Sequence, residues 1–218
     1  MKVYFISGLA ADRRAFKHIE LPTGFQAEYL DWITPQKNET LKDYSFRLAE
    51  KIDSNYPFVL IGLSMGGMIA SEISEKYNPA KTIIISSVPS SSQLPPYFRF
   101  ARKFKLYKFI PTQLIKSAAI AKRIFSKESN EDKTILRKMI KESSEVFIKW
   151  AIHAVVAWHK EDLPSSYIHI HGTNDELFPI SFTKPTHIIK NGGHFMVMTH
   201  SKKINQILEN TLTSLERK

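Results

Sequence analysis

Two short glycine-bearing turns in this sequence carry a serine and a histidine, the residue types of nucleophilic catalysis. Residues 62–66 read Gly-Leu-Ser-Met-Gly, between the apolar run Phe-Val-Leu-Ile and a helical pattern. Glycines on both sides of a serine at this spacing indicate a sharp strand-to-helix turn, because larger side chains two residues away would collide with it. Such a turn holds the serine Oγ clear of the sheet, so Ser64 is the predicted nucleophile.

A serine hydroxyl is too weak an acid to attack alone, so it needs a base, and the base needs an orienting carboxylate. His194 is the predicted base, because it follows a Gly-Gly pair after the last predicted strand. Asp175 is the predicted acid, because it lies in a turn after a buried strand and its short side chain would fix an imidazole tightly. The neighbouring Glu176 remains open as the alternative acid.

A third turn, at residues 7–11, could supply hydrogen bonds to the developing oxyanion of acyl transfer. The expected donors are the backbone N–H groups of Met65, directly after the nucleophile, and of Leu9, where Gly8 permits close approach. Most glycines of the chain lie in loops that follow or end a predicted strand. Ligands of open α/β sheets bind at this carboxyl edge, so the turns are expected to meet there.

Six short runs of β-branched and aromatic residues alternate with helical patterns. Several are almost wholly apolar, which is typical of strands covered on both faces of a parallel sheet. The sequence therefore predicts an α/β fold, with an open, mostly parallel sheet of about six strands and helices on both faces. The predicted strands are Val3–Ser7, Gln26–Leu30, Phe58–Ile61, Lys81–Ser86, Tyr167–His171 and Thr186–Lys190, and the main helical patterns of the core are Thr40–Asn55, Met65–Tyr77 and Ser201–Leu215.

The alternation stops after the fourth predicted strand. Residues 89–162 open with a segment rich in proline and serine and then show only helical patterns. We expect them to form a helical cap, inserted into a core made of residues 1–88 and 163–218. The cap patterns are Tyr97–Phe109, Thr112–Phe125, Asn130–Lys141 and Ser144–Lys160.

Five residues are candidates for the wall of a substrate pocket. Trp150, His153 and Trp158 lie on the last cap pattern, and Ala10 and Phe195 neighbour the catalytic atoms in sequence. The alternative for both tryptophans is an ordinary core position that anchors the cap to the sheet.

Together, the Ser7-Gly8 turn, the turn at 62–66, the turn from His171 to Asp175 and the Gly192–His194 loop resemble the α/β-hydrolase fold family over nearly the full length. The resemblance implies a Ser-His-Asp triad, a cap in the position of the 89–162 insert, and no metal or organic cofactor. One departure is Ser7, because many members have histidine before this glycine. The family's leading antiparallel strands have no counterpart, so all six strands are expected to be parallel.

Composition excludes several classes of protein. The 218 residues are 43% hydrophobic and 24% charged, which argues against wholesale disorder. The absence of cysteine excludes disulfides, thiolate metal sites and a cysteine nucleophile. The apolar run at the N-terminus is too short for a signal peptide and no run is long enough to span a bilayer, so the expected location is cytoplasmic.

The net charge of +10 is concentrated in one segment. Residues 99–141 contain 13 Lys and Arg against 3 Asp and Glu, which gives +10, while the rest has 18 of each sign. A solvated helical face explains this charge, and no nucleic-acid partner is expected. Contact of the basic cap with a membrane surface stays open, because Phe100, Phe104, Tyr107 and Phe109 alternate with Arg102, Lys103, Lys105 and Lys108 as in an interfacial helix. The oligomeric state is left open.

These observations predict a serine hydrolase that cleaves a small carboxylic ester, or a related acyl bond, through an acyl-enzyme. One alternative keeps the triad for carbon–carbon hydrolysis, lyase or thioester chemistry. Another is a non-catalytic binding protein on the same scaffold, because fold does not fix function.

Overall fold

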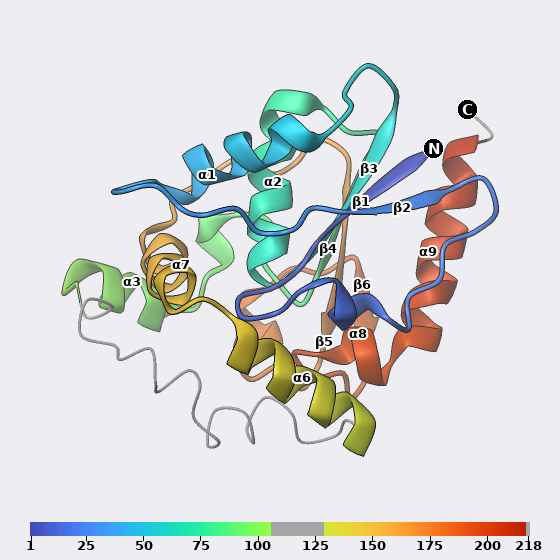
Figure 1. Ribbon diagram of the computed structural model, residues 1–218. Coiled ribbons are helices and arrows are strands. Elements are labelled where there is room, and N and C mark those ends of the chain that lie inside the picture. The colour runs from blue at the N-terminus through green and yellow to red at the C-terminus, as the bar shows by residue number, and fades with distance from the viewer. Residues whose placement is uncertain (106–128, 217–218) are drawn as a thin grey trace.

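The computed structural model describes residues 1–105 and 129–216, and in them six strands form one sheet (Figure 1). The strand order is β2-β1-β3-β4-β5-β6, and every neighbouring pair is parallel. The prediction of an open parallel α/β sheet is therefore confirmed. The strands are β1 (Lys2–Ile6), β2 (Gln26–Tyr29), β3 (Phe58–Leu63), β4 (Lys81–Ile85), β5 (Tyr167–Gly172) and β6 (His187–Ile189).

Helices cover both faces of the sheet. Helices α1 (Leu41–Leu48) and α2 (Met65–Tyr77) lie on one face, and α9 (Ser201–Glu216) lies on the other (Figure 1). Because side chains alternate along a strand, Val3 and Phe5 of β1 pack in the cluster that contains the apolar residues of α9, whereas Tyr4 and Ile6 pack in the cluster of α1 and α2. The short helix α8 (Met196–Thr199) precedes α9.

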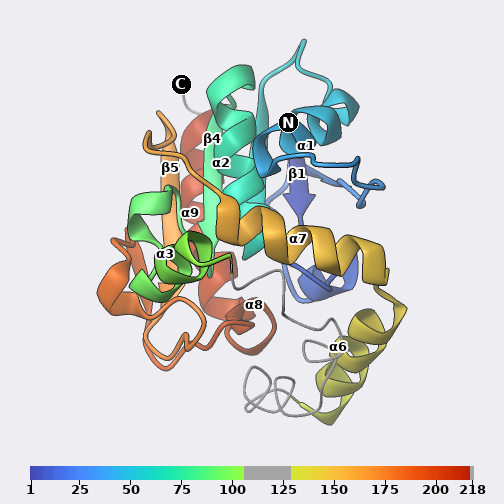
Figure 2. The ribbon, with the colours of Figure 1, turned by 90° about the vertical axis from the view of Figure 1, so that its left-hand side faces the viewer.

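Three helices lie between β4 and β5 in the described part of the chain. They are α3 (Pro96–Lys103), α6 (Asn130–Glu142) and α7 (Glu145–Ala157). Helices α3 and α7 lie on the side of the molecule away from α9, whereas α6 runs along the lower edge in Figure 1, and its Leu136 and Met139 pack in the same hydrophobic cluster as α9 (Figures 1 and 2). The predicted helix at Thr112–Phe125 lies outside the described residues, as do Tyr107, Lys108 and Phe109. The division into core and cap stays a prediction.

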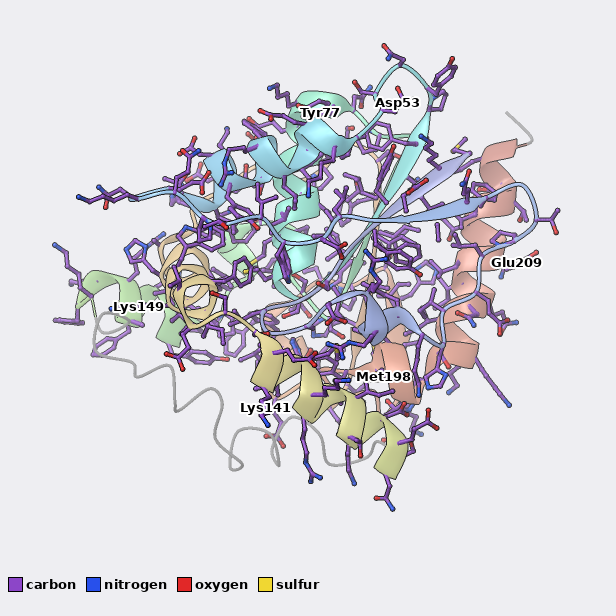
Figure 3. The ribbon with its side chains drawn as sticks, viewed as in Figure 1. Asp53, Tyr77, Lys141, Lys149, Met198 and Glu209 are labelled. Atoms are coloured by element: carbon purple, nitrogen blue, oxygen red, sulfur yellow. The ribbon has the colours of Figure 1, made fainter. Side chains whose placement is uncertain are left out.

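Ion pairs tie α6 to the short 3₁₀ helix η1 (Arg13–Phe16) and the residue after it. The Lys17 ammonium lies 2.8 Å from the Asp132 carboxylate, and the Arg14 guanidinium lies 2.6 Å from that of Glu142. Figure 3 labels Lys141 on α6 and Lys149 on α7, both far from Glu209 on α9. Helix α6 is therefore attached directly to the segment that follows β1.

The helix predicted at Thr40–Asn55 is shorter than expected. Helix α1 ends at Leu48, and a 3₁₀ turn, η2, continues to Lys51. Ile52 then has extended backbone, and the Asp53 N–H donates to the Tyr4 hydroxyl at 3.0 Å. The helix ends there because the Asp53 backbone is hydrogen-bonded to Tyr4 of the first strand.

Candidate active site

Ser64 lies at the sharp turn between β3 and α2. Its backbone is in the positive-φ region (φ 53°, ψ −122°), which non-glycine residues rarely adopt and which costs of the order of 1–3 kcal/mol. Backbone hydrogen bonds hold it there, because the Ser64 N–H donates to the Ile85 carbonyl at 3.0 Å and the Gly67 N–H donates to the Ser64 carbonyl at 2.8 Å. The neighbouring strand and the first turn of α2 thus fix the serine.

Only glycine fits at positions 62 and 66, on either side of Ser64. A Cβ atom at Gly62 would overlap the backbone of Gly66, and one at Gly66 would overlap the carbonyl groups of Ile6 and Ser7. Backbone atoms cannot move aside as a flexible side chain can. The spacing of the sequence motif therefore reflects the contact between this turn and the end of β1.

Ser64, His194 and Asp175 form a continuous chain of hydrogen bonds. His194 Nε2 lies 2.9 Å from Ser64 Oγ, and His194 Nδ1 lies 2.9 Å from Asp175 Oδ2. Because the carboxylate accepts the Nδ1–H, the Nε2 atom is left to accept the serine proton. All three residues are buried, with at most 8% of their surface exposed. The structure thus brings together the three residues that the sequence singled out.

Asp175, not Glu176, faces the imidazole. Asp175 Oδ1 accepts the N–H groups of Leu177 and Phe178, both at 2.9 Å, while Glu176 is exposed. Burial acts to raise the pKa of Asp175, but the charge and hydrogen bond of His194, the Phe178 N–H and His171 together outweigh it and hold the pKa below its ordinary value. Asp175 is therefore a carboxylate at neutral pH.

The turn after β1 lies directly against the serine. A Cβ atom added to Gly8 would be 3.6 Å from Ser64 Oγ. The Ser7 hydroxyl, which replaces the histidine common in the family, donates to the Ala11 carbonyl at 2.9 Å, and the Trp32 indole N–H donates to the same carbonyl at 2.8 Å. These bonds brace the turn that carries the Leu9 N–H.

Met65 is the first residue of α2, so its N–H has no acceptor within the helix. The partial positive charge of the helix N-terminus adds to that of this N–H. Within residues 1–105 and 129–216, neither the Met65 N–H nor the Leu9 N–H has an acceptor outside the regular elements. Both expected donors therefore lie in the turns next to Ser64, and their role in oxyanion binding stays a prediction.

Two histidines behind the triad acid had been assigned no role from the sequence. His171 Nε2 donates to the Phe178 carbonyl at 2.7 Å and lies 3.7 Å from Asp175 Oδ2. His171 Nδ1 must then accept, so His169 Nε2–H donates to it at 3.1 Å. Both imidazoles are fully buried. The His-x-His spacing on a buried strand was the available signal, because it places both side chains on one face of the sheet.

The buried His169 is expected to make stability depend on pH. Burial, and to a smaller extent His171, lowers the pKa of His169 to about 3 from its ordinary value of 6.5. The unfolded chain therefore binds a proton below about pH 6.5 that the folded chain does not bind until about pH 3. Between these values the free energy of unfolding should fall by about 1.4 kcal/mol per pH unit as the pH is lowered.

Urea unfolding across this pH range would measure the effect. His169→Gln keeps an N–H donor for His171 and removes the titrating group, so its slope should be smaller than that of the wild type. His159→Gln, which changes an exposed histidine, is the matched control and should keep the wild-type slope. An unchanged slope in His169→Gln would contradict this assignment.

Trp150 and Trp158, two of the candidates for the pocket wall, pack against the core. The Trp150 indole donates to the Glu39 carbonyl at 2.9 Å, and its ring lies 4.3 Å from that of Tyr44 in α1. Trp158 is 3% exposed, and its indole donates to the Glu72 carboxylate in α2 at 2.6 Å. Because an indole N–H that leaves water needs an acceptor, both residues anchor α7 to the core, which is the alternative that the sequence left open.

The other three pocket candidates have different surroundings. Phe195 is buried, and its ring stands edge-on to His194 at 5.7 Å. Ala10 is buried against Ile148 and Ile152 of α7, so this helix lies over the turn after β1. The side chain of His153 is exposed. Phe195 and Ala10 thus neighbour the site, whereas His153 lies on the surface.

A cavity of about 290 Å³ borders the segment that follows β1. None of the predicted pocket residues and none of the triad residues lines it. It is bounded by residues 11, 12 and 14, by residues 32–35, and by the junction of α6 and α7. Trp32, Met139 and Phe147 give it an apolar floor, and Arg14 and Glu142 lie in its wall. The volume is at the small end of the range for ligand sites.

Within the described ranges, no group of three or more metal-ligating side chains is placed to hold a metal ion. None of the described helices combines the length and apolar character that crossing a bilayer requires.

Comparison with known families agrees with this geometry. The model of the alpha/beta hydrolase family matches residues 3–207, which span all six strands and the triad. The chain belongs to the alpha/beta hydrolase family. No curated protein matches the sequence.

Several solved structures share the fold of this alpha/beta hydrolase at low sequence identity. An esterase from Thermogutta terrifontis is 18% identical with a TM-score of 0.71, over 99% of this chain and 90% of that one. The esterase EaEST from Exiguobacterium antarcticum is 17% identical with a TM-score of 0.71, over 99% and 92%. MenH from S. aureus is 15% identical with a TM-score of 0.77, over 99% and 94%. At these identities the likeness establishes the fold of this alpha/beta hydrolase.

Proposed function

We propose that this alpha/beta hydrolase is a serine hydrolase that cleaves a small carboxylic ester through an acyl-enzyme. The observation that carries the proposal is the chain of two 2.9 Å hydrogen bonds from Ser64 through His194 to Asp175. Two of the three structures compared above are esterases by name.

In the proposed reaction, Ser64 Oγ attacks the ester carbonyl while His194 Nε2 takes the serine proton. Asp175 holds the imidazole in the required tautomer and stabilises its positive charge. The N–H groups of Met65 and Leu9 hold the oxyanion of the tetrahedral intermediate. His194 then gives its proton to the leaving alcohol, and the same base activates the water that releases the acid.

Labelling with a fluorophosphonate probe tests the nucleophile, because such probes react with activated serines. The wild-type protein should be labelled and Ser64→Ala should not. Ser165→Ala, which changes an exposed serine in the loop before β5, is the matched control and should be labelled like the wild type. Labelling that survives Ser64→Ala would refute the assignment.

A panel of p-nitrophenyl esters of increasing acyl length then tests the substrate class. We expect kcat/KM to be highest for short acyl chains, because Ser64 and His194 are both buried and the Phe195 ring packs against His194, which leaves little room for a long chain. If the protein is labelled by the probe but hydrolyses none of these esters, Ser64 stands as the nucleophile and the proposed ester substrate is wrong.

A further inference from the structure

Helix α3 has apolar side chains on two faces, of which the inner one packs against the rest of the described protein and the outer one is largely exposed. On the inner face, Phe98 stacks on Phe178 with ring centroids 5.7 Å apart. On the outer face, Tyr97, Phe100 and Phe104 follow one another at helical spacing and are between 49% and 58% exposed. We call these three residues the aromatic stripe. An outward-facing stripe of this kind is unusual in a helix of a water-soluble domain and marks an interaction surface.

Hydrogen bonds near both ends of α3 hold the helix in place. The Tyr97 hydroxyl donates to the Leu177 carbonyl at 2.6 Å, which ties the start of α3 to the turn that carries the triad acid. The Arg102 guanidinium donates to the Trp158 carbonyl at 3.4 Å, near the end of α7. The Phe100 and Phe104 rings lie 4.5 Å apart. The helix therefore cannot turn its aromatic side inward without breaking these contacts.

Positive charge surrounds the aromatic stripe. Arg99 and Lys103 are exposed beside it, Lys105 follows directly, and residues 96–105 contain no acidic residue. The Lys103 ammonium lies 5.8 Å from the centre of the Phe104 ring. Aromatic side chains with flanking cations on one helix are the composition of helices that lie in the headgroup region of an anionic membrane.

We propose that the outer face of α3 binds the surface of an anionic phospholipid bilayer. The rings of the aromatic stripe enter the boundary between headgroups and acyl chains, and Arg99 and Lys103 pair with lipid phosphates. A second copy of the chain fits this surface less well, because the cations of both copies would meet. Figure 2 shows α3 facing the viewer beside α7, with α9 behind them, so the membrane would lie on the side opposite α9.

Vesicle flotation of the full-length protein tests this proposal without reference to catalysis. The probes are vesicles of phosphatidylcholine alone and of phosphatidylcholine mixed with phosphatidylglycerol. The wild type should float with the anionic vesicles only, and less as salt is raised. Arg99→Glu with Lys103→Glu should weaken binding by about thirtyfold or more, since each cation near an anionic surface contributes to binding. Phe100→Ser with Phe104→Ser should also weaken it, by about tenfold or more.

Two matched controls distinguish binding through α3 from effects of net charge and of losing any exposed aromatic residue. Lys202→Glu with Lys203→Glu makes the same change in net charge at exposed positions of α9, and Tyr56→Ser removes an aromatic residue that is 71% exposed elsewhere. Both controls should bind like the wild type, and thermal melting should show that every variant is folded. Loss of binding in the α9 variant equal to that in the α3 variant would overturn the proposal. So would failure of the wild type to float, or an oligomer that the aromatic substitutions dissociate.

Discussion

Replacement of His194 by alanine is expected to lower kcat for ester hydrolysis by about 10⁶, with little change in KM. The reason is that the hydrogen bond of 2.9 Å to Ser64 Oγ is the only route in the described site by which the serine proton can leave. Steady-state kinetics on the best p-nitrophenyl ester, after removal of contaminating esterase, would measure the change.

The matched control for this prediction is His159→Ala, which changes an exposed histidine in the segment after α7. It should hydrolyse the ester at the wild-type rate. Fluorophosphonate labelling of His194→Ala should be lost as well, because the serine would no longer be activated. A kcat within about tenfold of the wild type would show that another group serves as the base.

Replacement of Asp175 by asparagine is expected to lower kcat by about 10⁴ and to leave the fold intact. The amide can still accept the N–H groups of Leu177 and Phe178, but it favours the wrong imidazole tautomer and cannot stabilise the imidazolium. The same ester assay would measure the loss.

Glu176→Gln distinguishes the two carboxylates that the sequence left open. Its side chain is exposed, whereas Asp175 Oδ2 lies 2.9 Å from His194 Nδ1, so this variant should keep nearly full activity. Greater loss in Glu176→Gln than in Asp175→Asn would reverse the assignment of the acid.

The fold and the geometry at Ser64 could be predicted because both depend on local constraints. Apolar strands alternating with helices specify a parallel sheet, and a sheet of this kind brings the carboxyl ends of β3, β5 and β6 to one edge. Glycine spacing showed where the backbone turns most tightly, since any larger residue at 62 or 66 overlaps main-chain atoms. The positions of Ser64 and His194 followed from these two facts.

The contacts around the site were harder to predict, because they depend on which helix or strand each side chain packs against. The sequence favours Asp175 as the acid but leaves Glu176 open, and only the folded turn buries the first of them. The bonds of Trp150 to the Glu39 carbonyl just before α1, and of Trp158 to Glu72 in α2, arise from the docking of α7, which no local pattern encodes.

The sequence alone determined the order of strands and helices, the nucleophile turn and the candidate base, because steric limits on the backbone act over a few residues. Only the tertiary structure decided the choice of acid, the buried pair of histidines behind it, the anchoring role of the tryptophans and the outward direction of the aromatic stripe. Each of these depends on hydrogen bonds or burial between segments distant in the chain, and such contacts exist only after the helices have packed on the sheet.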